Sequence, residues 1–389
     1  MALLYEEIRQ YLLAEIQQGR LRPGDRLPSE ADLAEQFHVS RITSKKALQT
    51  LQQEGIVTRA RGRGTFVGDG GRASGSSASS AEAVVHRDGP GRATRGQRRI
   101  GFIAPDIDDI YGAELLRAIE HACAGLGAQL VFRRTTGDAG IETATIRNFA
   151  ATGIDGLIVF PIHGEYYNNE LLRLVLNGFP VVLVDRYLKG IAVASVTTDN
   201  FGAAHALTDA LLDDGHREIG FITAAPEHTS SIEDRWQGFL AALHDRGLEG
   251  RRDQSLLTLS STLPGASSDD AMAADREQIR QFLAANPDLT AVIACEFPLA
   301  QLLDLELRDR PEPRPGLTIA CFDSPPTRFG GHPYLHVHQR QDEIGRVAVA
   351  LLDEQFRDGA AHRHVAVPFD LVAPAPPQLS QTMPKDMLT

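Results

Sequence analysis

Residues 99–105 read RIGFIAP, and residues 219–223 repeat the core of that run as IGFIT. Both are nearly continuous apolar runs, which are typical of parallel strands covered by helices on both faces. Further runs of this kind are AQLVFR (128–133), GLIVF (156–160), PVVLVD (180–185), AVIAC (291–295) and LTIACFD (317–323). Amphipathic segments such as GAELLRAIEHACAGLG (112–127) lie between them. The repeat therefore predicts an α/β region made of two similar lobes with parallel sheets.

The first 67 residues have a different pattern, which predicts a compact helical unit followed by a hairpin. Leu4, Ile8, Leu12 and Ile16 form one apolar stripe on a helix. Ser29 is a predicted N-cap, with Asp32 in the capping-box position. Ser40 caps a third predicted helix, whose core-facing residues are Ile42, Ala47, Leu48 and Leu51. The stretch VTRARGRGTFV, at 57–67, then alternates like two short strands around a glycine-rich tip.

Composition limits the class of protein. With 389 residues, 42% of them hydrophobic, the chain is long enough for two or three domains. The net charge is −12, yet six cationic residues and a single acidic one lie between Val39 and Val67. Three widely separated cysteines give no metal-binding or disulfide pattern. Because the N-terminus is acidic and no apolar run reaches about 18 residues, we expect a cytoplasmic protein.

The arginines and glycines of residues 57–67 have two interpretations. They form either a loop that holds a nucleotide phosphate in an enzyme or a hairpin that binds the phosphates of DNA. A nucleotide-dependent enzyme requires a glycine-rich loop between a first strand and a helix, whereas this stretch precedes a Gly/Ser-rich segment. Residues 99–109 contain neither GxGxxG nor a P-loop lysine, and the chain contains no GxSxG motif. We therefore expect no enzyme activity and no cofactor.

The N-terminal segment LPSEADLAEQFHVSRITSKKALQTLQQEGIVTRARGRGTFV resembles the winged helix-turn-helix of GntR-type regulators. The resemblance implies that residues near the start of the third helix and in the hairpin, or wing, contact DNA. Arginine suits guanine edges, while threonine and lysine suit phosphates or base edges. Ala31 and Ile42 depart from some relatives, and Arg41 and Lys45 have an alternative interpretation as a solvated helix face. The implied DNA-binding residues are Ser29, Ser40, Arg41, Thr43, Lys45, Arg61, Gly62 and Arg63.

From residue 98 onward, the chain resembles the effector domain of LacI/GalR-type regulators, which is built like a periplasmic sugar-binding protein. The resemblance rests on IGFIAPDIDDIYGAELLRAIE, GIDGLIVFP, FPVVLVDR, VTTDNFGAAHALTDALLDDGHREIGFIT, DRWQGFLAAL and CFD. It implies a ligand cleft between the lobes and a dimer. Glu296 stands where relatives usually have another residue, so the ligand need not be a common sugar. The implied effector-binding residues are Asp109, Tyr111, His163, Arg235, Glu296 and Asp323.

Each of these side chains also has a purely structural interpretation. A strand-end aspartate is often a helix cap, Arg235 could bridge the lobes in an ion pair, and Tyr111 could simply pack. The pairing of a GntR-type head with a LacI-type body resembles the arabinose-repressor branch of GntR regulators. We therefore expect a multidomain fold: an α+β winged helix-turn-helix domain (1–68), a flexible linker (69–98), a two-lobed α/β effector-binding and dimerisation domain (99–373) and a loose tail (374–389).

The expected function is a ligand-responsive repressor of a carbohydrate-utilisation operon. It would bind double-stranded operator DNA as a homodimer, with no membrane or metal, and respond to a sugar or sugar derivative. A sensor whose head has lost DNA binding is the alternative. The sequence leaves open the effector, the operator, and whether the ligand releases or promotes DNA binding.

Overall fold

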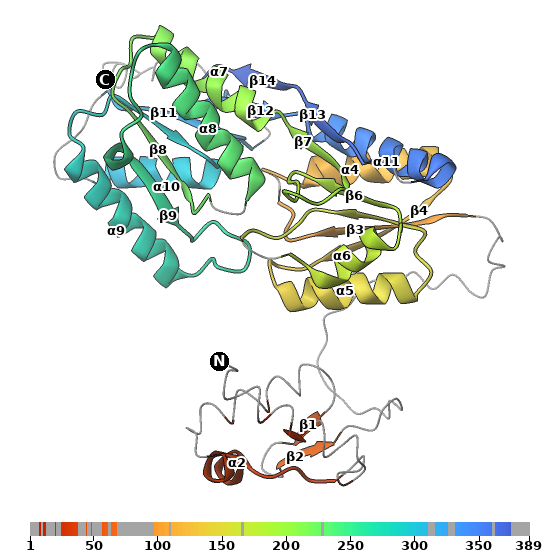
Figure 1. Ribbon diagram of the computed structural model, residues 1–389. Coiled ribbons are helices and arrows are strands. Elements are labelled where there is room, and N and C mark those ends of the chain that lie inside the picture. The colour runs from red at the N-terminus through yellow and green to blue at the C-terminus, as the bar shows by residue number, and fades with distance from the viewer. Residues whose placement is uncertain are drawn as a thin grey trace, which may run out of the picture. The chain divides into compact units, whose positions relative to one another are not determined.

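The computed structural model divides the chain into two compact units, residues Met1–Gly91 and Arg92–Thr389 (Figure 1). In the first unit the structure describes residues 8, 11–12, 20, 25–37, 44, 48, 57–60 and 64–67. In the second it describes residues 97–374 without 109, 165–166, 227–228, 310–315, 326–330 and 360–361. None of the helices in these ranges is long and apolar enough to span a membrane.

The N-terminal unit contains the predicted capping box. Helix α2 (Glu30–Gln36) follows Ser29, whose hydroxyl accepts a hydrogen bond from the Asp32 amide at 3.2 Å. The Asp32 carboxylate in turn accepts one from the Ser29 amide at 2.9 Å. Both orphan amides at the helix start are thus satisfied. The bond to Ser29 also lowers the pKa of Asp32.

The predicted hairpin is also confirmed. Strands β1 (Val57–Ala60) and β2 (Gly64–Val67) are antiparallel, and Val57 pairs with Val67. Arg26 adds a bridge to Phe66, so a third segment joins the hairpin. The core side chains described in this unit are Ile8, Leu12, Leu27, Leu33, Leu48 and Val57. Predicted core residues Leu4, Ile16, Ile42, Ala47 and Leu51 lie outside the described residues, as does most of the predicted linker.

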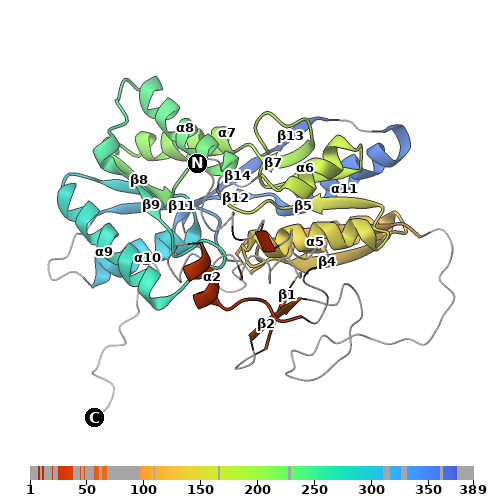
Figure 2. The same cartoon turned by 60° about the horizontal axis from the view of Figure 1, so that its bottom comes forward.

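The first lobe of the second unit is a six-stranded, fully parallel sheet of order β4-β3-β5-β6-β7-β13. Helices α4 and α11 cover one face, and α5 and α6 cover the other. Figure 2 shows the same lobe from a second direction. The strands are β3 (Arg99–Ala104), β4 (Gln129–Arg134), β5 (Gly156–Val159), β6 (Val181–Val184), β7 (Ala194–Thr198) and β13 (His364–Val367). The helices are α4 (Ala113–Gly125), α5 (Ala139–Ala151), α6 (Asn169–Leu176) and α11 (Gln341–Asp358).

The second lobe repeats this order as β9-β8-β10-β11-β12-β14, with β14 antiparallel to β12. Helices α7 and α8 cover one face, and α9 and α10 cover the other. Its strands are β8 (Ile219–Ala224), β9 (Ser255–Leu259), β10 (Ala291–Ala294), β11 (Thr318–Phe322), β12 (Leu335–Gln339) and β14 (Phe369–Val372). Its helices are α7 (Asn200–Asp213), α8 (Ser230–Asp245), α9 (Asp269–Ala285) and α10 (Phe297–Arg308), with the short η1 (Arg252–Gln254).

The repeated sequence IGFI holds the same place in both lobes, at the start of strands β3 and β8. Each is the first strand of its lobe and lies second from one edge of its sheet. The prediction of two similar α/β lobes is therefore confirmed, and all seven predicted strands are present. Strands β5, β6, β8 and β10 are buried along their whole length, as their continuous apolar sequences indicate.

The chain crosses between the lobes three times among the described residues. It passes from β7 to α7 at 198–200, from β12 to α11 at 339–341, and from β13 to β14 at 367–369. The first and third crossings run side by side, because the Asp199 amide donates a hydrogen bond to the Val367 carbonyl at 2.9 Å. These three short segments form the hinge of the unit, and they lie at the carboxyl ends of β7, β12 and β13.

Candidate effector cleft

A cavity of about 150 Å³ lies between the lobes at the carboxyl ends of their parallel strands. This is the edge at which open α/β sheets bind ligands. The cavity is smaller than the pockets of about 300–1,000 Å³ that hold drug-sized ligands, which favours a small metabolite. Its lining residues are Pro105, Asp106, Asp108, Ile110, Tyr111, Phe160, Asp185, Arg186, Ser231, Ile232, Arg235, Thr262, Pro264, Glu296, Phe297, Pro298, Asp323 and Gln339.

Two aspartates occupy matching positions in the two lobes. Asp185 follows β6 and Asp323 follows β11, each the fourth strand of its lobe in chain order. Both are buried, and both have a left-handed backbone, with φ of 68° and 61°. Non-glycine residues rarely adopt this conformation, and where they do the strain often marks a functional site. The repeat therefore places one carboxylate from each lobe in the cleft.

Arg235 lies on α8 and is held in place by neutral groups. Its Nε donates to the Asn200 side-chain oxygen at 2.8 Å, and one terminal nitrogen donates to the Cys295 carbonyl at 2.8 Å. Its guanidinium carbon lies 3.9 Å from the centre of the Phe322 ring, within cation–π distance. The side chain is 5% exposed. Arg235 is therefore a rigid cation in the cleft wall, fixed by Asn200 at the first lobe crossing.

The second lobe contributes two acidic side chains to the cleft, Asp323 and Glu296, and both are poorly solvated. Burial raises the pKa of Asp323 to about 7, against the opposing effect of the Arg235 charge. Burial also raises the pKa of Glu296, while the neighbouring Thr262 hydroxyl and then the charges of Arg235 and Arg186 act in the opposite direction. Asp185, in contrast, lies 3.2 Å from the Arg186 guanidinium and forms an ion pair with it. The carboxylates from the two lobes thus have different electrostatic partners.

Two buried hydroxyl groups in the cleft wall form no hydrogen bond of good geometry among the described residues, although each lies beside a carboxylate. They are the Tyr111 hydroxyl, beside Asp185, and the Thr262 hydroxyl, beside Glu296. A buried polar atom without a partner is costly, so such groups call for an explanation, and an absent ligand is one. The Tyr111 ring packs edge-on against Phe160 at 6.0 Å, and both residues line the cleft. Both groups are suited to bind ligand hydroxyls.

His163 lies beside the cleft rather than in its wall. Its Nδ1 is 3.0 Å from the Thr229 hydroxyl, which also accepts a hydrogen bond from the Gly164 amide at 3.2 Å. Burial and the neighbouring Arg186 lower the pKa of His163 to about 4, so the ring is neutral at physiological pH. The structure therefore places this predicted residue in a contact between the first lobe and the start of α8.

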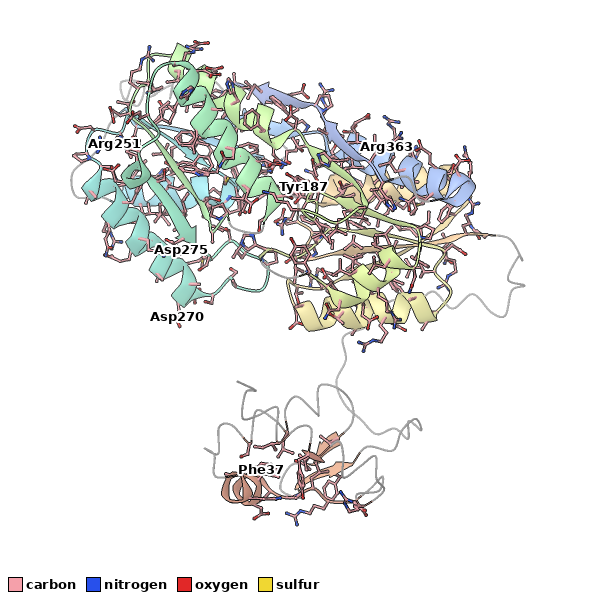
Figure 3. All side chains as sticks on the ribbon, viewed as in Figure 1. Phe37, Tyr187, Arg251, Asp270, Asp275 and Arg363 are labelled. Carbon is pink, nitrogen blue, oxygen red and sulfur yellow. The ribbon has the colours of Figure 1, made fainter. Side chains whose placement is uncertain are left out.

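The same border contains further contacts between the lobes. The Tyr187 amide donates to the Ser230 hydroxyl at 2.9 Å, and the Tyr187 hydroxyl donates to the Asp234 carboxylate at 3.1 Å. Lys189 forms an ion pair with Glu233, which also lies near the start of α8. Figure 3 shows Tyr187 at the boundary between the two lobes. These contacts hold the start of α8 against the first lobe along this border.

A buried chain of hydrogen bonds links the cleft to the hinge. The Gln339 amide nitrogen donates to the Asp323 carboxylate at 2.8 Å, and the Thr198 hydroxyl donates to the Gln339 oxygen at 2.8 Å. Thr198 and Gln339 end the strands that lead into two of the three lobe crossings. A ligand that binds Asp323 thus acts on a group connected directly to the hinge.

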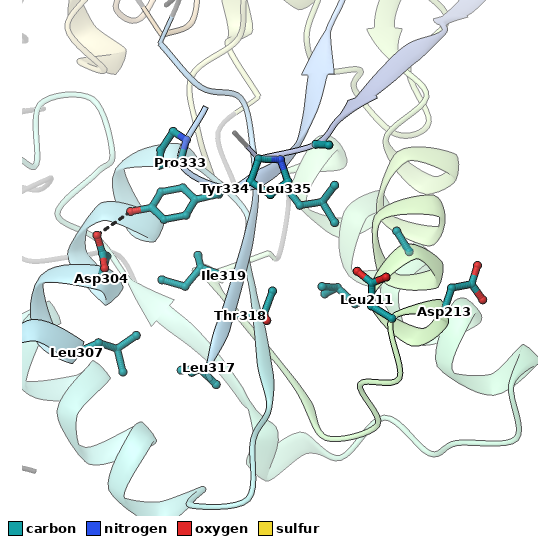
Figure 4. Close-up of a pocket in the computed structure, with 14 residues that line it drawn as sticks. Leu211, Asp213, Asp304, Leu307, Leu317, Thr318, Ile319, Pro333, Tyr334 and Leu335 are labelled. Carbon is teal, nitrogen blue, oxygen red and sulfur yellow. Dashed lines mark hydrogen bonds between the residues drawn. The ribbon is translucent and has the colours of Figure 1, made fainter. Parts of the chain in front are cut away.

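A second, larger hollow of about 680 Å³ lies at the opposite end of the second lobe's sheet (Figure 4). Leu317, Ile319 and Leu335 give it an apolar wall, and the Tyr334 hydroxyl is already bonded to Asp304 at 3.0 Å. It contains no buried hydroxyl without a partner among the described residues. Size alone therefore does not identify the site, and the polar groups that converge between the lobes favour the smaller cavity.

Four of the predicted effector residues line the cleft between the lobes, namely Tyr111, Arg235, Glu296 and Asp323. Asp109 lies outside the described residues. So do the predicted DNA-binding residues Ser40, Arg41, Thr43, Lys45, Arg61, Gly62 and Arg63. Ser29 is described and caps α2. Within the described part of the chain, no group of three or more histidine, cysteine or acidic side chains is arranged to hold a metal ion.

Sequence reasoning missed several polar groups in the cleft wall, among them Asp185, Arg186, Thr262 and Gln339. A signal existed for the first two, since Asp185 ends the predicted strand 180–185 and Arg186 follows it, just as Asp323 ends 317–323. Gln339 ends a strand that was not predicted, and Thr262 lies in a loop after β9. No local pattern distinguishes either of them from an ordinary polar residue.

Residues 97–297 match the family described as periplasmic binding proteins and sugar binding domain of the LacI family. Since the match spans more than half of the chain, the protein belongs to this family. Residues 4–67 match a second family, described as bacterial regulatory proteins, gntR family. The chain thus combines a GntR-type helix-turn-helix head with a LacI-type, mostly parallel two-lobed body.

Several known proteins are similar to parts of this chain. An arabinose metabolism transcriptional repressor of Geobacillus stearothermophilus is 28% identical over 61% of this chain and 60% of its own length. The fructose operon regulatory protein of Vibrio cholerae is 34% identical over 39% of this chain and 46% of its own length. The alignments thus span less than two thirds of these relatives. A putative ribose operon repressor from Burkholderia thailandensis has the same fold, with a TM-score of 0.59, 22% identity, and coverage of 71% of this chain and 98% of its own.

Proposed function

We propose that this protein is a ligand-responsive, DNA-binding transcriptional regulator that represses a carbohydrate-utilisation operon in the cytoplasm. The observation that carries the proposal is the cleft between the lobes, whose Asp323 is hydrogen-bonded through Gln339 to Thr198 at the hinge. The GntR-type head supplies a means of binding DNA. The similar proteins named for arabinose, fructose and ribose metabolism support a sugar-like effector. Because the matched families are regulators, we propose no enzyme activity.

Coupling between ligand and DNA follows from the two-lobed geometry. A ligand shifts the equilibrium between open and closed forms only if it binds one of them more tightly. Tyr111 and Asp185 belong to the first lobe, while Arg235, Glu296 and Asp323 belong to the second. A molecule that contacts both sets can do so only when the cleft is closed, so its binding energy drives closure about the hinge.

We propose that the operator is bound as a homodimer, because operators commonly match the two-fold symmetry of the regulator. Helices α9 and α10 offer a face for the second copy. On them, Met272 is 39% and Leu305 is 42% exposed, and both line one hollow with Leu302. We expect Leu305→Glu to give a monomer in light scattering. Leu176→Glu on α6, where the leucine is 86% exposed, is the matched control and is expected to leave the dimer intact.

Operator binding is tested by mobility shift with the DNA upstream of the protein's own gene. We expect specific binding that weakens with salt, by a log–log slope of about 0.9 for each neutralised phosphate. Arg61→Ala in the wing is expected to weaken binding and reduce that slope by about 1. Absence of specific binding at moderate salt would contradict the repressor assignment.

The effector cleft is tested with Arg235→Ala and the more conservative Arg235→Gln. We expect both to lose the response to effector, with affinity reduced about 100-fold, while operator binding is retained. Arg251→Ala is the control, because this second-lobe arginine lies at the surface beside Asp253 (Figure 3). A folded Arg235 variant that still responds normally would place the effector elsewhere.

A further inference from the structure

The charges that line the cleft do not balance. Among the described lining residues there are five carboxylates, Asp106, Asp108, Asp185, Glu296 and Asp323, and two guanidinium groups, Arg186 and Arg235. An excess of carboxylates favours cationic ligands over neutral or anionic ones, because electrostatic interactions strengthen where water is excluded.

The two outer carboxylates are accounted for by their neighbours. Asp106 is exposed and pairs with Arg134 at 3.1 Å. Asp108 is also exposed, and its carboxylate accepts hydrogen bonds from the Ile110 and Tyr111 amides at 2.7 and 2.8 Å. Both groups therefore serve the loop after β3, and solvent screens their charges.

The inner part of the cleft has three carboxylates, Asp185, Glu296 and Asp323, against the two arginines. Arg186 is committed to Asp185 at 3.2 Å and also donates to the Pro161 carbonyl at 3.1 Å. Arg235 is fixed by neutral acceptors, as described above. In the part of the chain that the structure describes, neither Glu296 nor Asp323 forms an ion pair. When all three are ionised, the inner cleft thus holds one carboxylate more than its two cations balance. Without a ligand, part of this excess is neutralised by protonation, because the pKa of Asp323 is raised to about 7.

Burying a charge without a partner is costly, so a ligand that supplies the missing positive charge gains affinity. A neutral ligand leaves the imbalance, and an anionic ligand increases it. The aromatic side chains of Tyr111 and Phe297 also line the cleft, and aromatic rings attract ammonium groups. The Phe160 ring already has the Arg186 guanidinium 5.1 Å from its centre. The buried hydroxyls of Tyr111 and Thr262 provide partners for ligand hydroxyls.

We propose that the cleft binds a small hydroxylated molecule carrying one ammonium group, of the amino-sugar class, and that Glu296 is the carboxylate that selects this charge. The inference rests on the proposed effector cleft and specifies the chemistry that it recognises. Glu296 directly precedes α10 and faces the charges of Arg235, Arg186 and Asp185. It therefore stands where an ammonium group would be shared with Asp323.

The test uses the full-length protein and sets of related ligands, each with an amine, a neutral and a carboxylate member. The molecules of the first set are achiral, so differences in stereochemistry cannot affect the comparison. They are Tris as the amine, pentaerythritol as the neutral analogue and 2,2-bis(hydroxymethyl)propionate as the anion. The other sets are glucosamine, glucose and glucuronate, and their galactose counterparts. Thermal shift in HEPES at pH 7.5 screens each set, and calorimetry gives Kd for every ligand that stabilises the protein.

We expect the amine to bind most tightly in each set that binds, about tenfold more tightly than its neutral partner. Glu296→Gln keeps the shape of the side chain and is expected to abolish this preference. Asp253→Asn removes an exposed carboxylate of the second lobe that lies outside the cleft, and it is expected to retain the preference. The melting temperatures without ligand show that both variants fold.

The proposal is overturned if a neutral or anionic member binds as tightly as its amine, if no amine binds, or if the preference survives in Glu296→Gln. A neutral sugar that binds and releases operator DNA would overturn this inference but leave the proposed function intact. Conversely, a preference for amines in a protein that binds no DNA would support the inference and contradict the proposed function.

Discussion

The two lobes share one strand order but contribute different chemistry to the cleft. After the third strand of the first lobe come Phe160 and Pro161, whereas the corresponding residues of the second lobe are Cys295 and Glu296. After the fourth strand, both lobes have a buried aspartate, and only Asp185 has an arginine paired with it. The scaffold thus repeats the positions that face the cleft, while the residue after the third strand and the partner of the aspartate after the fourth strand differ between the lobes.

The lobes are also packed differently, and this difference gives the largest expected effect. Gly238 on α8 packs against α7, and a Cβ there would lie 2.2 Å from the Phe201 carbonyl oxygen. Gly345 on α11 packs against α4, where a Cβ would lie 2.7 Å from the Cβ of Ala118. We expect Gly238→Ala to destabilise the protein by about 3 kcal/mol and Gly345→Ala by less, measured by denaturant unfolding.

Gly125→Ala is the control for this pair. It lies at the end of α4, where an added Cβ meets nothing within 4 Å. Since alanine favours helix over glycine, this variant should be unchanged or more stable by up to about 1 kcal/mol. Equal losses at Gly238 and Gly345 would show that the two helix pairs are equally tight, contrary to the structure.

The two strand-end aspartates give the second prediction. The folded-state pKa of Asp323 is raised to about 7, so the folded protein binds more protons than the unfolded chain between about pH 4 and 7. Stability therefore falls as pH rises through that range. We expect Asp323→Asn to stabilise the ligand-free protein by roughly 1–3 kcal/mol above pH 7, with the gain shrinking towards pH 4, in thermal unfolding across pH.

Asp185→Asn is the matched variant in the first lobe. It leaves Arg186 without the carboxylate that it contacts at 3.2 Å, so we expect no stabilisation. Both variants should bind effector less tightly. A stabilisation of the same size in Asp185→Asn would indicate that the lobes do not differ in the way that the ion pair suggests.

The contacts across the lobe border give the smallest effect. Tyr187→Phe removes the hydroxyl that donates to Asp234 at 3.1 Å but keeps the ring. One hydrogen bond of this kind contributes about 0.5–1.5 kcal/mol, so effector affinity should fall by a few fold through weaker closure. Tyr167→Phe is the control, since that side chain is 41% exposed. Calorimetry with any ligand found in the screen measures the difference.

Much of the fold could be predicted from the sequence, because strands buried on both faces have continuous apolar sequences. The strands that escaped prediction are β7, β9, β12, β13 and β14. In β7, Thr197 and Thr198 interrupt the apolar run, and in β12 His336 and Gln339 do so although both are buried. These polar residues lie near the lobe crossings. They make the sequences of β7 and β12 less continuously apolar, so the strands could not be predicted from an apolar run.

The candidate site was predicted only in part, for a related reason. Residues that follow a predicted strand, such as Glu296 and Asp323, could be placed at the correct edge of a sheet. His163 follows a strand as well, yet the start of α8 engages it through Thr229. Whether a strand-end side chain faces the cleft or a neighbouring element depends on contacts distant in sequence, which no local pattern records.

The number of lobe crossings has a practical consequence. Because three is odd, the described part of the body begins with β3 in one lobe and finishes with β14 in the other. The DNA-binding head is joined covalently to the first lobe alone, so a rotation between the lobes turns its attachment point relative to β14. The distance between fluorophores attached near residues 98 and 373 would therefore report rotation between the lobes. It can be measured without DNA and before any effector is known.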